Sequence, residues 1–157
     1  MEENNAVTEQ PSGPQFAIQR TFIKDLSFET PMGVKVFTQA FQPKVKMDVK
    51  TRGNSIAEGV HEIVLTLTIT AKVEEDTAYI VELQQAGIFA IKGFPEEQMA
   101  HVLGAVCPNF LFPYAREAVD SIVVKGGFPP LSIAPIDFDA IFRQSQASAD
   151  QSGQSLN

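Results

Sequence analysis

Hydrophobic and polar residues alternate along the first half of the chain, and this alternation predicts β-strands. In the clearest case Val45, Met47 and Val49 are separated by lysines and an aspartate, which gives the segment one apolar and one charged face. A period of two is typical of a strand with one buried face. The segments that follow this pattern are residues 16–28, 45–52, 63–71 and 77–85.

Short links join the predicted strands, and they favour antiparallel pairing. Gly53-Asn54 follows the second strand, and Glu74-Glu75-Asp76 precedes the fourth. Both links are rich in residues that prefer turns, and both are too short for a helical crossover between parallel strands. We therefore expect a four-stranded antiparallel sheet.

The second half of the chain changes to helical spacing. Pro95 followed by two glutamates is typical of a helix start, and apolar residues then recur at helical intervals up to Pro108. A longer helix is expected from about Pro108 or Pro113 to Lys125, with a proline-marked break between the two helices. Strands first and helices afterwards predict an α+β fold.

Glycines and prolines divide the rest of the C-terminal part. Gly126-Gly127 is a stop signal for the long helix, and residues 128–135 are expected to be extended because their prolines remove backbone donors. Asp137 then caps a last short helix. The polar tails are expected to be disordered. The expected organisation is a tail over residues 1–14, one domain over 15–143 and a second tail over 144–157.

Composition and charge narrow the class of protein. A length of 157 residues suits one domain, and 12 phenylalanines without a tryptophan indicate apolar contact surface. The formal net charge of −7 argues against nucleic acid as the main partner, because phosphate binding needs a basic surface. The single cysteine forms no intrachain disulfide, the acidic start is unlike a signal peptide, and no apolar run is long enough to span a bilayer. We expect a soluble cytoplasmic protein without stable membrane insertion.

His101 and Cys107 are the side chains that most suggest catalysis or metal binding. Their spacing fits neither a common zinc motif nor one face of a helix, and most residues between them are apolar. A nucleophilic cysteine would need an electropositive, partly exposed setting. We therefore expect both residues to be structural, with no catalytic residue, no metal and no cofactor. A hydrolase that uses this pair stays as an alternative.

Charged and apolar side chains on the predicted strands leave several surfaces to explain. The second strand carries a basic stripe, and the first and fourth carry carboxylates: Lys44, Lys46, Lys50 and Arg52, and Asp25, Glu29 and Glu82. Taken alone, both sets are ordinary solvent-facing charges. Apolar and threonine side chains on both faces of the sheet have two explanations, subunit association or a groove for apolar client segments.

The segment Met99–Glu117, MAHVLGAVCPNFLFPYARE, closely resembles the signature of the SecB family of protein-export chaperones. The resemblance extends over roughly residues 16–143 and includes IQR, KDLSFE and DFDAIF, which begin at Ile18, Lys24 and Asp137. It implies a homotetramer built as a dimer of dimers. It also implies an ATP-independent chaperone that binds unfolded precursor proteins and passes them to the SecA translocation ATPase.

The resemblance also implies roles for particular residues. By position, the SecA-docking surface of the family matches Asp25, Glu29, Ile80 and Glu82, and the client contacts match Val45, Met47, Val49, Tyr79 and Phe142. The family's best-known members end in a basic element that binds the zinc domain of SecA, whereas this chain has no lysine or arginine after Arg143. Delivery is then expected to rest on the sheet surface alone. The alternative is a SecB-like chaperone or scaffold dedicated to one client, such as a toxin–antitoxin system.

Overall fold

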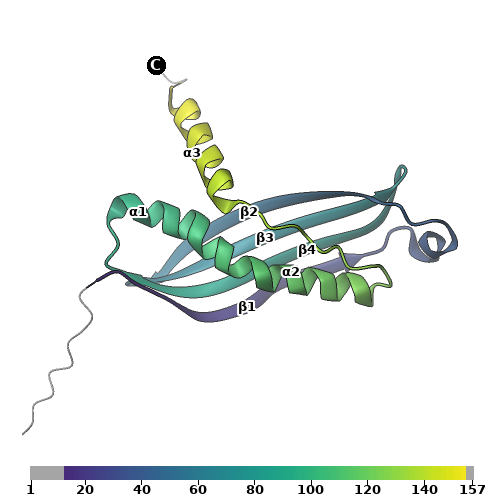
Figure 1. Ribbon diagram of the computed structural model, residues 1–157, viewed down its shortest axis with the longest axis horizontal. Coiled ribbons are helices and arrows are strands. Elements are labelled where there is room, and N and C mark those ends of the chain that lie inside the picture. Colours follow the sequence, from purple (N-terminus) through teal and green to yellow (C-terminus); the bar gives the residue numbers. More distant parts are fainter. Residues whose placement is uncertain (1–12, 155–157) are drawn as a thin grey trace, which may run out of the picture.

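A four-stranded antiparallel sheet with helices along one face forms the body of the protein (Figure 1). The structure is a computed structural model that describes residues 13–154. The strands are β1 (Gln15–Glu29), β2 (Lys44–Ala57), β3 (Val60–Val73) and β4 (Asp76–Lys92), in the spatial order β1-β4-β3-β2. A short 3-10 helix, η1 (Gly33–Thr38), lies between the first two strands. The predicted α+β class and the antiparallel sheet are confirmed.

The turn predicted at Gly53-Asn54 is wrong, because β2 continues through both residues to Ala57. The chain reverses after Ala57, in the turn where Gly59 adopts a φ of 67°. Gly53 instead meets a neighbouring strand closely: a Cβ placed there would lie 2.8 Å from Cδ1 of Ile63. The glycine therefore signals a close approach between strands and not a change of direction.

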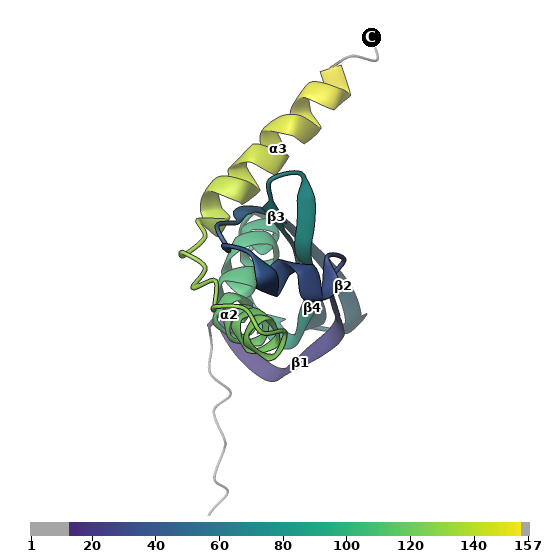
Figure 2. The ribbon, with the colours of Figure 1, turned by 90° about the vertical axis from the view of Figure 1, so that its right-hand side faces the viewer.

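The two faces of the sheet differ in character, as the alternation predicted. One face, here called the core face, carries fully buried side chains such as Leu65 and Leu67 on β3 and Leu83 on β4. These pack with Leu111 and Val119 of the long helix that crosses this face. Burial of each such side chain contributes about 1.5–3 kcal/mol. The opposite face, here called the open face, is covered by no helix of the described chain (Figures 1 and 2).

The helical run after β4 has no break at its prolines, which corrects the prediction. It consists of α1 (Glu96–His101), the π-helical segment η2 (Val102–Val106) and α2 (Cys107–Lys125), one directly after another. The backbone N–H of Cys107 donates to the carbonyl of Val102, a wider turn than that of an α-helix. A proline ring crowds the preceding turn of an α-helix, and this wider turn gives Pro108 room. Pro113 lies inside α2, where buried neighbours hold the helix together.

The end of α2 follows the prediction. Gly127 has a φ of 89°, and the N–H groups of Gly127 and Phe128 donate to the carbonyls of Val124 and Val123. This pair of hydrogen bonds is a Schellman motif, which glycine makes possible by its freedom to adopt a left-handed conformation. Residues 128–136 then run in an extended conformation back along the core face and are here called the strap.

The last helix, α3 (Phe138–Gln154), begins as predicted and ends later. The carboxylate of Asp137 accepts a hydrogen bond from the N–H of Ala140 at 3.0 Å, which is the expected N-terminal cap. Order was predicted to end near Gln144, but α3 continues to Gln154 and projects away from the sheet (Figure 2). Alanine and glutamine favour helices, and this stretch contains no proline. Residues 1–12 and 155–157 of the predicted tails lie outside the described residues.

Candidate functional site

The residues that the family resemblance assigns to SecA docking lie together on the open face. The register pairs Glu29 with Ile80, and Glu82 with Ser27 on β1. Asp25 lies one diagonal step from Glu82, a separation of about 7–8 Å in such sheets. Asp25, Glu29 and Glu82 are exposed and Ile80 is half-buried. We call these four residues the acidic patch.

The acidic patch keeps its negative charge because a neighbouring lysine is committed elsewhere. Lys24 follows Ile23 at a bulge in β1 and donates to both carboxylate oxygens of Glu62, at 2.9 and 3.1 Å. Within residues 13–154 none of the three patch carboxylates forms an ion pair. Like charges held close together favour a partner that brings positive charge.

An apolar hollow on the core face brings together two of the residues assigned to client contact. It has a volume of about 250 Å³ and lies between β2 and the strap. Val45 and Met47 form its floor with Ile69, and Val45 is 46% exposed. The strap supplies the other wall with Leu131, Ser132, Ile133 and Ala134. We call this hollow the apolar groove; Val49 continues the same face of β2.

The strap wall is fastened to α2 by one carboxylate. Oδ1 of Asp120 accepts hydrogen bonds from the N–H of Leu131 at 2.9 Å and from that of Ser132 at 3.1 Å. Ser132 has a φ of 50°, an uncommon conformation for a residue with a side chain. The position of Leu131 in the groove therefore depends on a residue far from it in the sequence.

Tyr79 and Phe142 lie apart from the apolar groove. Tyr79 is only 1% exposed, and its ring centroid lies 4.8 Å from that of Phe128 and 5.9 Å from that of Phe28. Burial, assisted by the negative charge of Asp120, raises the pKa of Tyr79 to about 12. A client reaches this ring only if the strap moves away.

Phe142 packs on the π-helical segment instead of on β2. A Cβ at Gly104 would lie 2.7 Å from the Phe142 ring, so the glycine provides the space in which the ring sits. This contact docks the N-terminal part of α3 against η2. The sequence analysis did not identify Leu131 and Ile133 as groove residues. The sequence feature that could have indicated them is an apolar pair inside a proline-rich extended segment.

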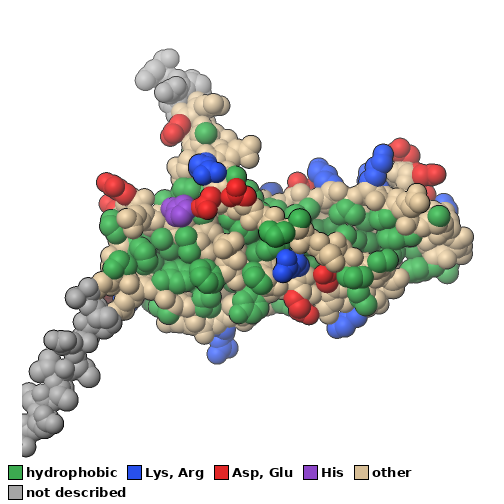
Figure 3. Space-filling view, viewed as in Figure 1, with side chains coloured by type: hydrophobic (Ala, Val, Ile, Leu, Met, Phe, Trp, Pro, Cys, Tyr) green, Lys and Arg blue, Asp and Glu red, His purple; other side chains and the backbone are tan. Residues whose placement is uncertain are grey.

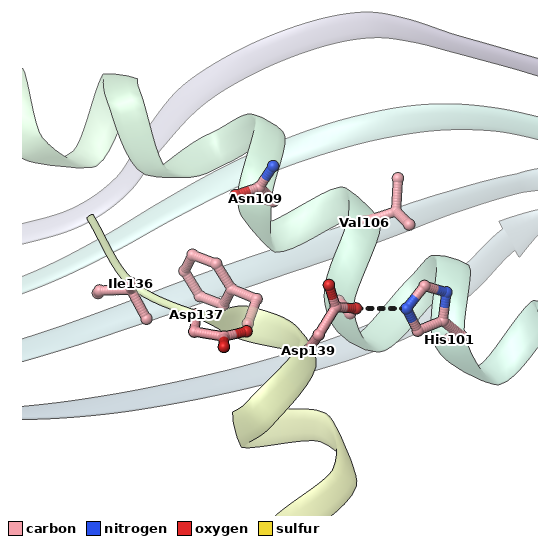
Figure 4. Close-up of a pocket in the computed structure, with 8 residues that line it drawn as sticks. His101, Val106, Asn109, Ile136, Asp137 and Asp139 are labelled. Carbon is pink, nitrogen blue, oxygen red and sulfur yellow. Dashed lines mark hydrogen bonds and ion pairs between the residues drawn. The ribbon is translucent and has the colours of Figure 1, made fainter.

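His101 and Cys107 do not form a reactive pair. His101 faces Asp139 of α3, with 2.5 Å between Nε2 and Oδ1 (Figure 4). Cys107 is fully buried, and desolvation raises the pKa of its thiol to about 12, so it stays protonated at neutral pH. His101 thus contacts α3, and Cys107 is part of the hydrophobic core.

No group of three or more His, Cys, Asp or Glu side chains within residues 13–154 is placed to hold a metal ion. In the same part of the chain, no helix has both the length and the apolar character needed to cross a membrane.

Comparisons with known proteins agree with the resemblance seen in the sequence. The profile of a family described as preprotein translocase subunit SecB matches residues 9–149. The protein-export protein SecB of Methylococcus capsulatus is 51% identical over 154 residues, covering 98% of this chain and 97% of the relative. The protein-export protein SecB of Cellvibrio japonicus is 49% identical over 152 residues, with 96% and 91% covered.

A solved SecB-like structure shares the fold. It is a SecB-like chaperone of Mycobacterium tuberculosis in complex with a ChAD peptide from the HigA1 antitoxin. The two structures align with a TM-score of 0.62 at 12% identity, covering 77% of this chain and 87% of that one. At this identity the likeness concerns the fold alone.

Proposed function

This chain belongs to the SecB family, and from that premise we propose how it carries out its role as a protein-export chaperone. It binds unfolded precursor proteins without ATP, keeps them competent for translocation and delivers them to the SecA ATPase. By mass action, a protein that binds only the unfolded state draws its client away from folding and aggregation. The family is one of chaperones and not of enzymes, and we propose that this chain performs no catalysis.

The apolar groove is the observation that carries the proposal for client binding. Its floor, Val45 and Met47, lies on an edge strand, and Val45 is 46% exposed. The groove walls are aliphatic and offer few fixed hydrogen-bonding groups. Such a surface accepts many apolar sequences, because contact by shape and area selects weakly among side chains. We propose that Val49 extends it, and that Tyr79 and Phe142 join it when the strap and α3 shift.

The acidic patch supports the proposal for delivery. Its exposed carboxylates lie on the open face, opposite the face that holds the groove. Client and SecA therefore bind on different sides of the sheet and do not compete for space. We propose that SecA contributes a basic surface to this contact, since charge complementarity speeds and orients association.

The exposed apolar side chains of a single chain support assembly into a homotetramer, a dimer of dimers. Phe110, Tyr114 and Val124 of α2 are 47%, 49% and 52% exposed, and Figure 3 shows hydrophobic side chains gathered along this helix. Ile18 and Ile23 of β1 are 36% and 49% exposed. Association between copies buries such surface. We propose that the tetramer works in the cytoplasm, where precursors appear before export.

A chaperone dedicated to a single client is the second candidate. The antitoxin peptide belongs to the Mycobacterium tuberculosis protein, whose likeness here is at 12% identity. The relatives near 50% identity are named for protein export. The export role is therefore favoured over the dedicated one.

The test is an ATP-free aggregation assay with a chemically unfolded precursor, run with and without SecA. The chain should suppress aggregation in proportion to its concentration, and SecA should then bind the chaperone–precursor complex in a pull-down. Suppression for one client and none for unrelated precursors would support the dedicated chaperone. Failure to hold any precursor would contradict the proposal.

A further inference from the structure

Five basic side chains occupy one side of the open face. Lys44, Lys46, Lys50 and Arg52 alternate along β2, so they share a face, and Lys72 of β3 lies directly opposite Lys44. We call these five residues the basic ridge. Like charges directly opposite across two strands destabilise a sheet. The Lys44–Lys72 pair therefore lowers the stability of the sheet, in a chain whose net charge is −7, and a role in binding explains why these charges are kept.

The charge of the basic ridge is largely unneutralised. Within residues 13–154, Lys44, Lys50, Arg52 and Lys72 have no ion-pair partner. Asp48 lies among them, but its contact with Lys46 spans 4.0 Å between side chains that are 59% and 79% exposed. Such an exposed pair contributes little. The ridge is therefore free to receive negative charge from outside.

A hollow gives the basic ridge a place for a ligand. It has a volume of about 480 Å³ and is lined by Lys44, Lys46, Lys72 and Thr70, together with Glu74. Val45, on the floor of the apolar groove, also borders this hollow, which therefore reaches the edge of β2. Three ammonium groups face one carboxylate there, so the hollow keeps a positive balance. The Thr70 hydroxyl adds a neutral donor of the kind that binds carboxylates.

The basic ridge and the acidic patch lie side by side on the open face. A column of threonines on β3, Thr66, Thr68 and Thr70, separates β2 from β4. Two strand spacings amount to roughly 10 Å. Charges in salt at physiological strength are screened over about 8 Å, so an approaching molecule meets two regions of opposite sign and not an average.

We propose that the basic ridge is a docking site for an acidic peptide segment of a partner protein. The open face then selects a partner surface in which acidic and basic residues form separate blocks, the acidic block on β2 and β3 and the basic block on β1 and β4. Selection of a two-block surface rests on the proposed docking of SecA at the acidic patch, whereas binding of an acidic segment at the basic ridge does not. A nucleic acid fits less well, because a long polyanion that follows the ridge meets Asp25, Glu29 or Glu82 where it strays across the face.

The test measures binding of fluorescent peptides by anisotropy to the full-length assembled protein. The probes are a peptide with a block of glutamates, its lysine counterpart, a two-block peptide and a single-stranded oligonucleotide of equal charge. Lys46→Glu and Lys72→Glu should each weaken binding of the glutamate peptide about tenfold. Binding of the lysine peptide should stay the same or become tighter. Arg143→Glu on α3 changes the net charge equally and should have no effect. Circular dichroism and size-exclusion chromatography verify that each variant folds and assembles.

The outcomes separate this proposal from the proposed function. Equal affinity of the ridge variants and the Arg143→Glu control for the glutamate peptide would overturn it, and so would tighter binding of the oligonucleotide than of that peptide. Asp25→Lys should weaken only the lysine and two-block peptides. If SecA fails to bind the unaltered protein while the glutamate peptide still requires Lys46 and Lys72, delivery to SecA is wrong and the ridge proposal stands.

Discussion

Asp120 and Ser132 are joined by a hydrogen bond that links α2 to the strap, with 3.1 Å between the carboxylate oxygen and the backbone nitrogen. The same oxygen accepts the N–H of Leu131. One side chain thus holds two consecutive amides of a segment that has no strand partner. This contact, together with packing of Leu131 and Ile133 against the core, positions one wall of the apolar groove.

Replacement of Asp120 by alanine should therefore loosen the strap. We expect a loss of about 1–3 kcal/mol in the free energy of unfolding, because two backbone donors lose a charged acceptor. Asp120→Asn keeps an acceptor oxygen and should lose less. Urea unfolding measures both variants, and hydrogen exchange at Leu131 and Ser132 should accelerate first. Unchanged exchange in Asp120→Ala would show that the strap is held by packing alone.

The apolar groove predicts a separation of client binding from SecA binding. Val45→Asp or Met47→Asp places a charge on the groove floor, and we expect about tenfold weaker suppression of aggregation because the charge resists desolvation by a client. Ile56→Asp is the matched control, since Ile56 lies on β2 with 54% exposure and outside the groove. If all three variants behave alike, the groove does not bind clients.

The acidic patch predicts the reverse effect. Glu82→Lys should weaken SecA binding about tenfold and leave client holding intact, since removal of one charged partner at a docking surface affects orientation and rate of association. Glu58→Lys, in the turn between β2 and β3, makes the same change of charge away from the patch. The difference in SecA affinity between the two variants should be smaller in titrations at high salt than at low salt, because salt screens exposed charges. If Glu82→Lys binds SecA as tightly as the unaltered protein does, the acidic patch is not the docking site.

Two buried acids predict a loss of stability in alkaline solution. The pKa values of Cys107 and Tyr79 are raised to about 12 from ordinary values of 9.0 and 10.0, chiefly by burial. The unfolded chain releases these protons at lower pH than the folded one, so the stabilisation is complete below about pH 9 and is lost progressively up to about pH 12. Urea midpoints measured across this range should fall. Cys107→Ala and Tyr79→Phe should each flatten the slope, and parallel curves for all three proteins would contradict the assignment.

Local patterns predicted the four strands and some of the helix ends of this fold. Alternation placed Val45 and Met47 on one face of β2, and Gly126-Gly127 and Asp137 marked a helix end and a helix start as the structure has them. The errors have non-local causes. Gly53 imitates a turn residue although its role is to admit Ile63, and Pro108 imitates a helix breaker although the π-helical turn accommodates it.

The candidate site divides in the same way. The family resemblance alone grouped the four residues of the acidic patch, and the pairing of β1 with β4 places them together on the open face. The groove was predicted only in part. Leu131 lines the groove because its backbone N–H is held by Asp120 of α2. A contact of this kind, between a helix and an extended segment, leaves no periodic pattern in the sequence.

The strand order β1-β4-β3-β2 also determines when the acidic patch forms during synthesis. β2, β3 and β4 follow one another as local hairpins, but β1 pairs only with β4, and Gln15 must wait for Lys92. Contacts between distant parts of a chain form late, because the intervening loop must first be closed. A ribosome-bound fragment that stops before β4 contains Asp25 and Glu29 but lacks Glu82 and the strand that pairs with β1. If the acidic patch is the docking site, as proposed above, only a finished sheet binds SecA, and an incomplete chaperone does not compete with a complete one for this partner.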